Sequence, residues 1–268
     1  MILPKKLLVL LAFLLAFFVL FTLIDSLLLW DENAYLGNAR SHLTQSSYTE
    51  NFRFPLLEWI ITAFWLAGES IFLAKLAVIL FSLGTVVLVY LIADGMFKKR
   101  AFWLTLIYSF SYLFLYWGFR IYTEPVMLFF ILLSFYLLIK NNYWLAGIFA
   151  GLAFLAKFPS AIFALSVFLF LIYKKGFKNS ALFSLLFLLS LVPWLSSNHI
   201  THGNILWDFI QQYNIVEAYT VAQPFFDGLK SLFSSIGLLI IFLPFGFYSL
   251  LKKKIKYAEP MLLFSFLT

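Results

Sequence analysis

The sequence predicts an all-α membrane protein whose chain crosses the bilayer about eight or nine times. Of its 268 residues, 63% are hydrophobic, 21% are aromatic and only 12% are charged, which leaves too few polar side chains to cover a water-soluble domain. Several runs reach the roughly 18 to 20 apolar residues that a helix needs to cross a hydrocarbon layer about 30 Å thick. The runs are continuously apolar and do not alternate with polar residues, so we expect helices and not a β-barrel.

The first apolar run follows Lys5 and Lys6 and covers about 7–29. It has no small-residue cleavage site and is long enough to span, so we expect a retained helix and not a signal peptide. Further spans are expected at about 69–94, 101–119, 125–140, 143–157, 160–173, 180–196 and 231–251, with a last one beginning near 258. Only eight residues follow Pro260, so we expect this last helix to be cut short and the chain to be a piece of a longer protein.

The basic residues divide the expected helix ends into two sides. Thirteen of the 19 Lys and Arg residues stand in short groups between apolar runs, and a cytoplasmic N-terminus places all thirteen on the cytoplasmic side. The net charge of +7 therefore indicates membrane topology and not a nucleic-acid partner. The groups are Lys5 and Lys6, Lys98 to Arg100, Lys140, Lys174, Lys175 and Lys178, and Lys252 to Lys254 with Lys256.

Two long segments, about 30–68 and 197–230, fall on the outer face in this threading and hold most of the acidic residues, some at the membrane interface. We therefore expect one transmembrane domain over 1–268, with its active site on the outer or lumenal face. The expected location is integral to a membrane, which is the plasma membrane if the source is prokaryotic.

The first candidate site is the pair Asp31 and Glu32, which stands where the chain leaves the bilayer after the first run. If a helix starts here, Asp31 and Tyr35 lie one turn apart on the same face. A carboxylate held at the membrane surface beside apolar residues tends to have a raised proton affinity, which suits a general base. The structural alternative is that Asp31 caps a short interfacial helix, which Trp30 anchors in the interface.

This segment resembles a motif of the glycosyltransferase C superfamily. The Asp-Glu pair after the first transmembrane helix, with Tyr35 and Ala39-Arg40 behind it, is similar to the protein mannosyltransferase and aminoarabinose transferase branch. Three more segments resemble motifs of that branch in the same order, and together the resemblance covers about 7–200. They are Phe54 to Trp59 with Pro55 and Glu58, Arg120 to Pro125 with Glu124, and Gly151 to Pro159 with Lys157.

The resemblance implies an inverting transfer of a sugar from a polyprenyl-phosphate carrier to a protein, lipid or glycan acceptor. It implies that Asp31 is the base acting on the acceptor nucleophile, with Glu32 as a supporting or acceptor-orienting group. The acceptor hydroxyl must lose a proton as it attacks the anomeric carbon, and the lipid phosphate must leave with its charge stabilised. The expected substrate-binding residues are Tyr35, Arg40, Arg53, Glu58, Arg120, Glu124 and Lys157.

Three basic residues on the expected outer face, Arg53, Arg120 and Lys157, are candidates for the phosphate contact. A basic side chain at the bilayer edge costs desolvation energy unless it has an anionic partner. The structural alternatives are that Arg120 pairs with Glu124 one helical turn away and that Lys157 extends to the lipid headgroups. The aminoarabinose branch commonly has a lysine where this chain has Phe54, and Arg53 is the candidate substitute.

We predict no catalytic metal and no cofactor. Related oligosaccharyltransferase subunits hold a metal with acidic residues at comparable places, whereas the mannosyltransferase-like branch generally works without one. Glu124 precedes Pro125, so it can instead cap a helix. His199 and His202 form a pair that can bind zinc, but no third ligand stands at a suitable spacing, and ordinary loop residues are the alternative.

Two non-enzymatic alternatives stay open, a carrier or flippase for polyprenyl lipids and a membrane scaffold whose polar residues only cap helices. A transporter should place charged residues deep within its spans, whereas Asp25 and Lys75 stand close to span ends. The ordered outer-face motifs favour the enzyme. Its expected partners are the polyprenyl-phosphate sugar, the acceptor and membrane lipid.

Overall fold

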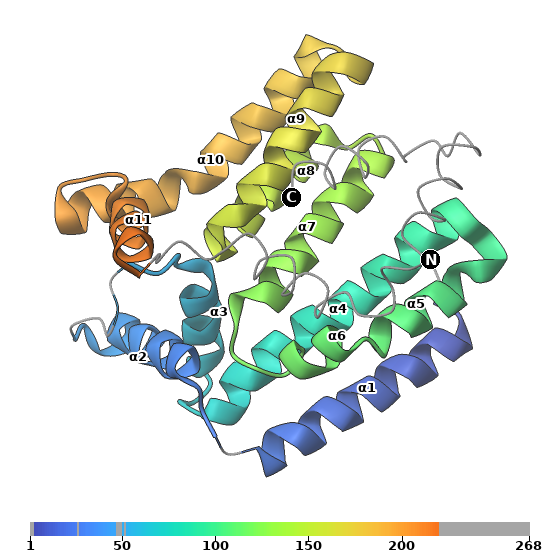
Figure 1. Cartoon of the computed structure of the whole chain (residues 1–268), viewed down its shortest axis with the longest axis horizontal. Helices are drawn as coiled ribbons and strands as arrows, with labels where there is room; N and C mark the ends of the chain where they lie inside the picture. Colours follow the sequence, from blue (N-terminus) through green and yellow to red (C-terminus); the bar gives the residue numbers. More distant parts are fainter. Residues whose placement is uncertain (1–2, 26, 47–49, 51, 220–268) are drawn as a thin grey trace.

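The computed structural model describes residues 3–25, 27–46, 50 and 52–219, and all the regular elements in these ranges are helices (Figure 1). The all-α prediction is therefore confirmed for this part of the chain. The elements are α1 (Lys5–Ile24), α2 (Trp30–Thr44), α3 (Leu56–Trp65), α4 (Ile71–Phe97), η1 (Lys98–Arg100), α5 (Ala101–Ser109), α6 (Tyr112–Trp117), α7 (Thr123–Ile139), α8 (Tyr143–Ala156), η2 (Phe158–Ser160), α9 (Ala161–Lys175), α10 (Phe177–His202) and α11 (Trp207–Tyr219).

The long helices pack in a chain of neighbours, α1 on α4, α4 on α7, α7 on α8, and α8 on α10, which also contacts α9. Figure 1 shows the shorter helices α2, α3 and α11 gathered at one end of this array. Apolar residues fill these long helices because lipid and neighbouring helices are their surroundings. The short helices at the end are where polar side chains can meet.

Four helical segments of the described chain are long and apolar enough to cross a membrane: Lys5–Ile24, Ile71–Ser109, Phe158–Lys175 and Phe177–His202. The apolar helices α7 and α8 are shorter, with 17 and 14 residues. The count of eight or nine crossings stays a prediction, and the expected spans at 231–251 and from 258 lie outside the described residues.

The prediction of one helix over 7–29 is wrong at its end. Helix α1 stops at Ile24, and Asp25 is extended with φ −84° and ψ 91°. Two long-range bonds hold Asp25 in this conformation. Its carboxylate pairs with Arg120 at 2.8 Å, and its backbone carbonyl oxygen accepts a hydrogen bond from Lys75 Nζ at 3.0 Å. The next helix begins at Trp30.

The segments expected as outer loops, 30–68 and 197–230, are largely helical where the structure describes them. Helices α2 and α3 occupy most of the first segment. In the second, α10 continues to His202, where Gly203 ends it in the left-handed conformation with φ 69°, and α11 follows. The helix expected over 101–119 is divided into α5 and α6, because Ser111 is extended with φ −67° and ψ 139°.

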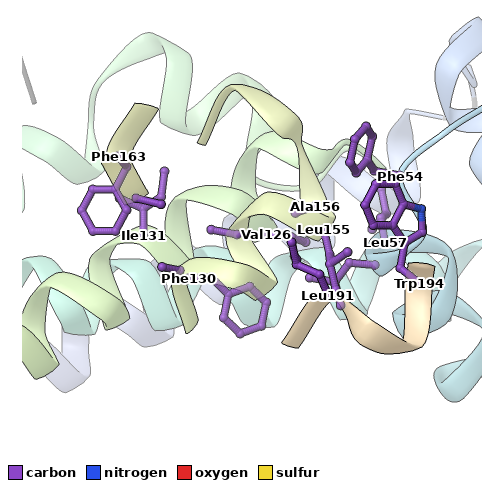
Figure 2. Close-up of a cluster of buried hydrophobic side chains, with 14 of the residues drawn as sticks. Phe54, Leu57, Val126, Phe130, Ile131, Leu155, Ala156, Phe163, Leu191 and Trp194 are labelled. Atoms are coloured by element: carbon purple, nitrogen blue, oxygen red, sulfur yellow. The ribbon is translucent and has the colours of Figure 1, made fainter. Parts of the chain in front are cut away.

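The largest apolar core runs between α7, α8, α9 and α10 toward α3 (Figure 2). Near α3 it includes the rings of Phe54 and Trp194, whose centroids are 5.1 Å apart. Phe54 lies between Arg53 and α3, so this core fixes the segment that presents Arg53. Figure 2 labels Phe54, Leu57, Val126, Phe130, Ile131, Leu155, Ala156, Phe163, Leu191 and Trp194 along this core.

Small residues let α8 and α10 approach closely. A methyl group on Gly147 would overlap the backbone carbonyl oxygen of Phe183, and one on Gly151 would overlap the side chain of Ser190. Both glycines line the contact between the two helices. Backbone atoms cannot move aside as a flexible side chain can.

Replacing Gly147 with alanine is therefore expected to lower the stability of the protein by about 1–3 kcal/mol. The matched control is Gly95→Ala in α4, where nothing lies within 4 Å of the added methyl group. That control is expected to gain about 0.5–1 kcal/mol from helix propensity. Thermal unfolding in detergent checks both variants, and an equal response at the two sites would contradict the close approach.

The described groups of basic residues lie at the helix ends opposite to those that carry Asp31, Glu124 and Lys157. They stand at the start of α1, after α4, after α7 and between α9 and α10, whereas Asp31, Glu124 and Lys157 follow α1, open α7 and end α8. The helices therefore alternate in direction in the way that the positive-inside threading requires. The orientation of this array in a membrane stays a prediction.

Candidate active site

A charged pocket of about 230 Å³ lies between α2, the start of α7, the turn from α8 to α9, and α11. Five of the nine predicted site residues line it: Asp31, Tyr35, Arg53, Glu124 and Lys157. They come from four separate segments of the chain. The rest of the lining consists of Phe54, Tyr122, Thr123, Ala156, Phe158 and Gln212.

Helix α2 carries Asp31 and Tyr35 to this pocket on one face, as their spacing predicted. The alternative that Asp31 caps this helix is wrong, because Leu29 holds the N-cap position. The Glu32 carboxylate accepts the Leu29 backbone N–H at 2.9 Å, which is one half of a capping box. Asp31 is thus left to bind other partners.

Arg53 is the partner of Asp31. Its Nη2 lies 2.7 Å from Asp31 Oδ1 and 2.6 Å from Glu50 Oε2, and its guanidinium stands 4.7 Å from the Tyr35 ring centre. The Asp31 side chain remains 42% exposed, whereas that of Arg53 is only 12% exposed. Arg53 is therefore placed to orient Asp31, while the Asp31 carboxylate remains open to a reactant.

Burial and charge define the protonation of the two groups beside Asp31. Burial raises the pKa of Tyr35, and the Arg53 charge opposes this only in part, so Tyr35 is a neutral phenol at neutral pH. Burial lowers the pKa of Arg53, but Tyr35 and Asp31 outweigh it and raise the pKa above its ordinary value. Arg53 therefore stays cationic throughout the pH range in which a protein is folded.

Lys157 and Glu124 form the other charged side of the pocket, with Lys157 Nζ 2.5 Å from Glu124 Oε1. The two side chains are 42% and 36% exposed, so a ligand can reach both. Glu124 does not cap α7, because that helix begins at Thr123 with Tyr122 as its N-cap. Its partner is Lys157 and not Arg120, which contradicts the local pair and the alternative in which Lys157 extends away from the protein.

Glu32 and Arg120 lie outside the pocket lining, in a buried network beside it. Glu32 is fully buried and accepts hydrogen bonds from the backbone N–H of Ile121 at 3.0 Å and from Arg120 Nη1 at 3.3 Å. Arg120 also pairs with Asp25, as described above. The network joins α2, the α1–α2 connection and the segment before α7, so it fixes the two walls of the pocket relative to each other.

Arg40 and Glu58, the remaining predicted site residues, also lie away from this pocket. Arg40 is exposed and pairs with Glu69 on a separate surface. Glu58 is buried in a second, smaller pocket of about 40 Å³ that Arg53 also lines. Arg53 is therefore the element common to the two pockets.

Tyr122 and Glu50 are site residues that the sequence reasoning did not select. Tyr122 lines the charged pocket, and its ring centre lies 4.5 Å from that of Trp117. Burial, with the carboxylates of Asp31, Glu32 and Glu124, raises the pKa of Tyr122 to about 12. The position of Tyr122 within the Arg120 to Pro125 motif could have identified it from the sequence. For Glu50, the only indication in the sequence was its position three residues before Arg53.

An apolar pocket of about 380 Å³ adjoins the charged one at Glu124, which lines both. It lies between α4, α5, α6 and α7, that is, among helices that include a predicted membrane span. Its other lining residues are Ser82, Thr85, Tyr108, Ser111, Leu113, Phe114, Trp117, Gly118, Pro125 and Leu128. An elongated ligand with a charged head and an apolar tail has the chemistry that these two pockets offer.

The His199 and His202 pair does not form a metal site with its neighbours. Among the described residues, no group of three or more His, Cys, Asp or Glu side chains is placed to hold a metal ion. The His202 ring stacks on Trp207 with centroids 4.7 Å apart, and Asp208 accepts the Trp194 indole N–H at 2.6 Å. These residues act here as packing and hydrogen-bonding groups.

The buried carboxyl of Glu58 makes stability depend on pH. Burial raises its pKa, although hydrogen bonds from His42 and Asn38 lower it in part. A carboxyl with a raised pKa stabilises the fold below its unfolded value of about 4.3 and loses that contribution as pH rises through the folded value. The ionised Glu58 carboxylate therefore lowers the free energy of unfolding at pH 8.

The Glu58→Gln variant is accordingly expected to gain stability relative to the wild type between pH 5 and pH 8. A change of about 1 kcal/mol corresponds to a shift in Tm of about 2–4 °C for a chain of this size. The control is Glu69→Gln at an exposed ion pair, which should show no such trend. A stability difference for Glu58→Gln that is the same at both pH values would contradict the burial argument.

A sequence model of one protein family, described as dolichyl-phosphate-mannose-protein mannosyltransferase, matches residues 53–197, which is more than half of the chain. The match includes Arg53, Glu124 and Lys157 of the charged pocket and begins after Asp31. No curated protein and no solved structure matches the chain significantly.

Proposed function

Because this chain belongs to the dolichyl-phosphate-mannose-protein mannosyltransferase family, we propose that it moves a sugar from a polyprenyl-phosphate carrier to a protein acceptor by an inverting mechanism. The resemblance noted in the sequence is thereby confirmed at the level of the family, and the protein is an integral membrane glycosyltransferase. The observation that carries the finer proposal is the charged pocket, because an accessible carboxylate and an accessible cation line one cavity that adjoins an apolar pocket.

Asp31 acts as the general base in this proposal. The acceptor hydroxyl oxygen attacks the anomeric carbon from the face opposite the phosphate, and its proton passes to the Asp31 carboxylate. Arg53 holds the Asp31 carboxylate in place at 2.7 Å, and the exposed part of Asp31 leaves room for the hydroxyl. Tyr35, as a neutral phenol with burial-raised pKa, serves as a hydrogen-bond donor in the same wall.

Lys157 stabilises the leaving group. As the bond from the anomeric carbon to the phosphate oxygen breaks, its electron pair stays on the polyprenyl phosphate, which gains negative charge. Lys157 is the cation with the more accessible side chain in the pocket lining, at 42% exposed against 12% for Arg53. The phosphate displaces Glu124 from Lys157 when the donor binds, because both anions compete for one ammonium group.

The apolar pocket takes the first isoprene units of the carrier. It begins at Glu124, where the phosphate pocket ends, and continues among apolar helices, so one lipid can occupy both. Burial of each methylene group in such a pocket contributes about 0.8 kcal/mol. A carrier with more isoprene units is therefore expected to bind more tightly until the pocket is full. The distribution of basic residues supports a pocket on the outer or lumenal face.

The decisive experiment is transfer of radiolabelled sugar from a panel of polyprenyl-phosphate sugars to serine- and threonine-containing peptides, in membranes that carry the full-length protein. The panel varies the sugar and, separately, the number of isoprene units. Transfer that is selective for one sugar and rises with carrier length supports the proposal. Absence of transfer from every donor, with labelled lipid crossing the bilayer, would instead support a polyprenyl-lipid carrier. The absence of both activities would leave the scaffold function.

A further inference from the structure

A buried amide on α2, Asn38, holds the segment that presents Arg53. Its side chain is 1% exposed and bonds to both backbone polar groups of Glu50. Asn38 Nδ2 donates to the Glu50 carbonyl oxygen at 2.7 Å, and Asn38 Oδ1 accepts the Glu50 N–H at 3.0 Å. These two hydrogen bonds fix the position and the orientation of the Glu50 backbone, which lies twelve residues after Asn38 in the sequence.

Glu50 passes this constraint on to Arg53. Its carboxylate Oε2 accepts from Arg53 Nε at 2.6 Å, and its Oε1 accepts the indole N–H of Trp30 at 2.7 Å. Arg53 in turn binds Asp31, as described above. Asn38, Glu50, Arg53 and Asp31 thus form one continuous chain of hydrogen bonds from the interior of α2 to the charged pocket.

Glu58 fixes the amide from behind. Asn38 Nδ2 also donates to Glu58 Oε1 at 2.6 Å, and this bond is buried. With one acceptor on Glu50 and another on Glu58, the amide cannot turn over without losing both bonds and facing two acceptors with its own oxygen. The orientation that presents the Asn38 oxygen to the Glu50 N–H is therefore determined by Glu58.

We propose that Asn38 is a positioning residue for the transfer reaction, acting through Glu50 and Arg53 to hold the Asp31 carboxylate toward the acceptor. The proposal rests on the function proposed above for Asp31. It assigns a role to a residue that touches neither substrate. It also explains why the predicted site residue Glu58 lies outside the pocket, because Glu58 orients the amide and has no need to reach a ligand.

The test measures the transfer kinetics of variants in which the hydrogen bond between Asn38 and Glu58 is first removed and then restored with donor and acceptor exchanged. Asn38→Asp keeps the acceptor for the Glu50 N–H but removes both donors, so kcat is expected to fall about tenfold with a smaller change in the KM for the donor lipid. Adding Glu58→Gln supplies an amide that donates to the new carboxylate, and at least a third of the lost activity should return. The control is Ser41→Ala, which removes a buried hydrogen bond of α2 to the Asn38 backbone oxygen and nothing from the chain.

A second measurement reads the contact without any activity. Hydrogen exchange of the Glu50 backbone amide is expected to speed up at least tenfold in Asn38→Leu and to stay unchanged in Ser41→Ala. Unchanged exchange in Asn38→Leu, an unchanged kcat in Asn38→Asp, or an equal loss of kcat in Ser41→Ala would overturn the proposal. If the wild type transfers no sugar but the exchange result holds, the contact stands and the proposed function fails.

Discussion

Replacing Asp31 with asparagine is expected to lower kcat for sugar transfer by about 10²- to 10⁴-fold, the range that a positioned general base contributes. Asparagine has nearly the same shape and still offers an oxygen to Arg53, so the pocket should keep its structure. It has no basic group to take the acceptor proton. The KM for the donor should change little, because the proposed phosphate contact is Lys157 at the end of α8 and not Asp31 on α2.

The comparison variant for this prediction is Asp94→Asn, an exposed carboxylate near the far end of α4. Both variants are measured in membranes with the protein quantified by immunoblotting, and thermal unfolding in detergent checks the fold. A kcat for Asp31→Asn within about threefold of the wild type, with normal abundance, would remove Asp31 from the base role. Glu124 would then be the accessible carboxylate to test next.

Helical periodicity in the sequence predicted those features of the site that depend on a single helix. The position of Asp31 and Tyr35 on one face needed only the start of a helix near Trp30, and the structure confirms it. The close approach at Gly147 was predictable for the same reason, because a small residue on an apolar helix marks a packing surface. Both features can be recognised within one helix, although Phe183, the partner of Gly147, comes from another helix.

Helix boundaries set by distant partners were not predictable. Between α1 and Leu29 only Asp25 and Ser26 interrupt the apolar residues, and no glycine or proline marks an end of the helix. The helix ends at Ile24 because Asp25 is held by Arg120 and Lys75, which lie 95 and 50 positions away. Only the tertiary arrangement of α1, α4 and the segment before α7 brings these groups together.

The ion pairs of the site also depend on residues that are distant in the sequence. Spacing by four residues allowed a pair between Arg120 and Glu124 as the structural alternative, but α7 begins at Thr123, so the two residues do not share a helix. Arg120 turns to buried Glu32, and Glu124 pairs with Lys157, 33 positions away. Four charged residues selected from the sequence therefore line the pocket, whereas the local ion pair that the spacing allowed is not formed.

Lys157 variants provide the second large effect. Lys157→Gln is expected to lower kcat/KM for the donor by about 10- to 100-fold, since a hydrogen bond to a charged group contributes about 1.5–3 kcal/mol. Both the KM and kcat should worsen, because the ammonium contacts the phosphate in the ground state and stabilises its added charge as it leaves. Lys157→Arg keeps the charge and should retain most of the binding. Lys140→Gln, an exposed lysine at the far end of α7, is the control.

Removal of Glu124 separates the two effects of Lys157. In Lys157→Gln the Glu124 carboxylate loses its partner and repels the donor phosphate, so part of the rise in KM comes from Glu124 itself. Adding Glu124→Gln should therefore lower the KM again while kcat stays low, because no cation is restored for the leaving phosphate. If the double variant recovered kcat as well, the Lys157 charge would matter only for neutralising Glu124, and the leaving-group role would have to pass to Arg53.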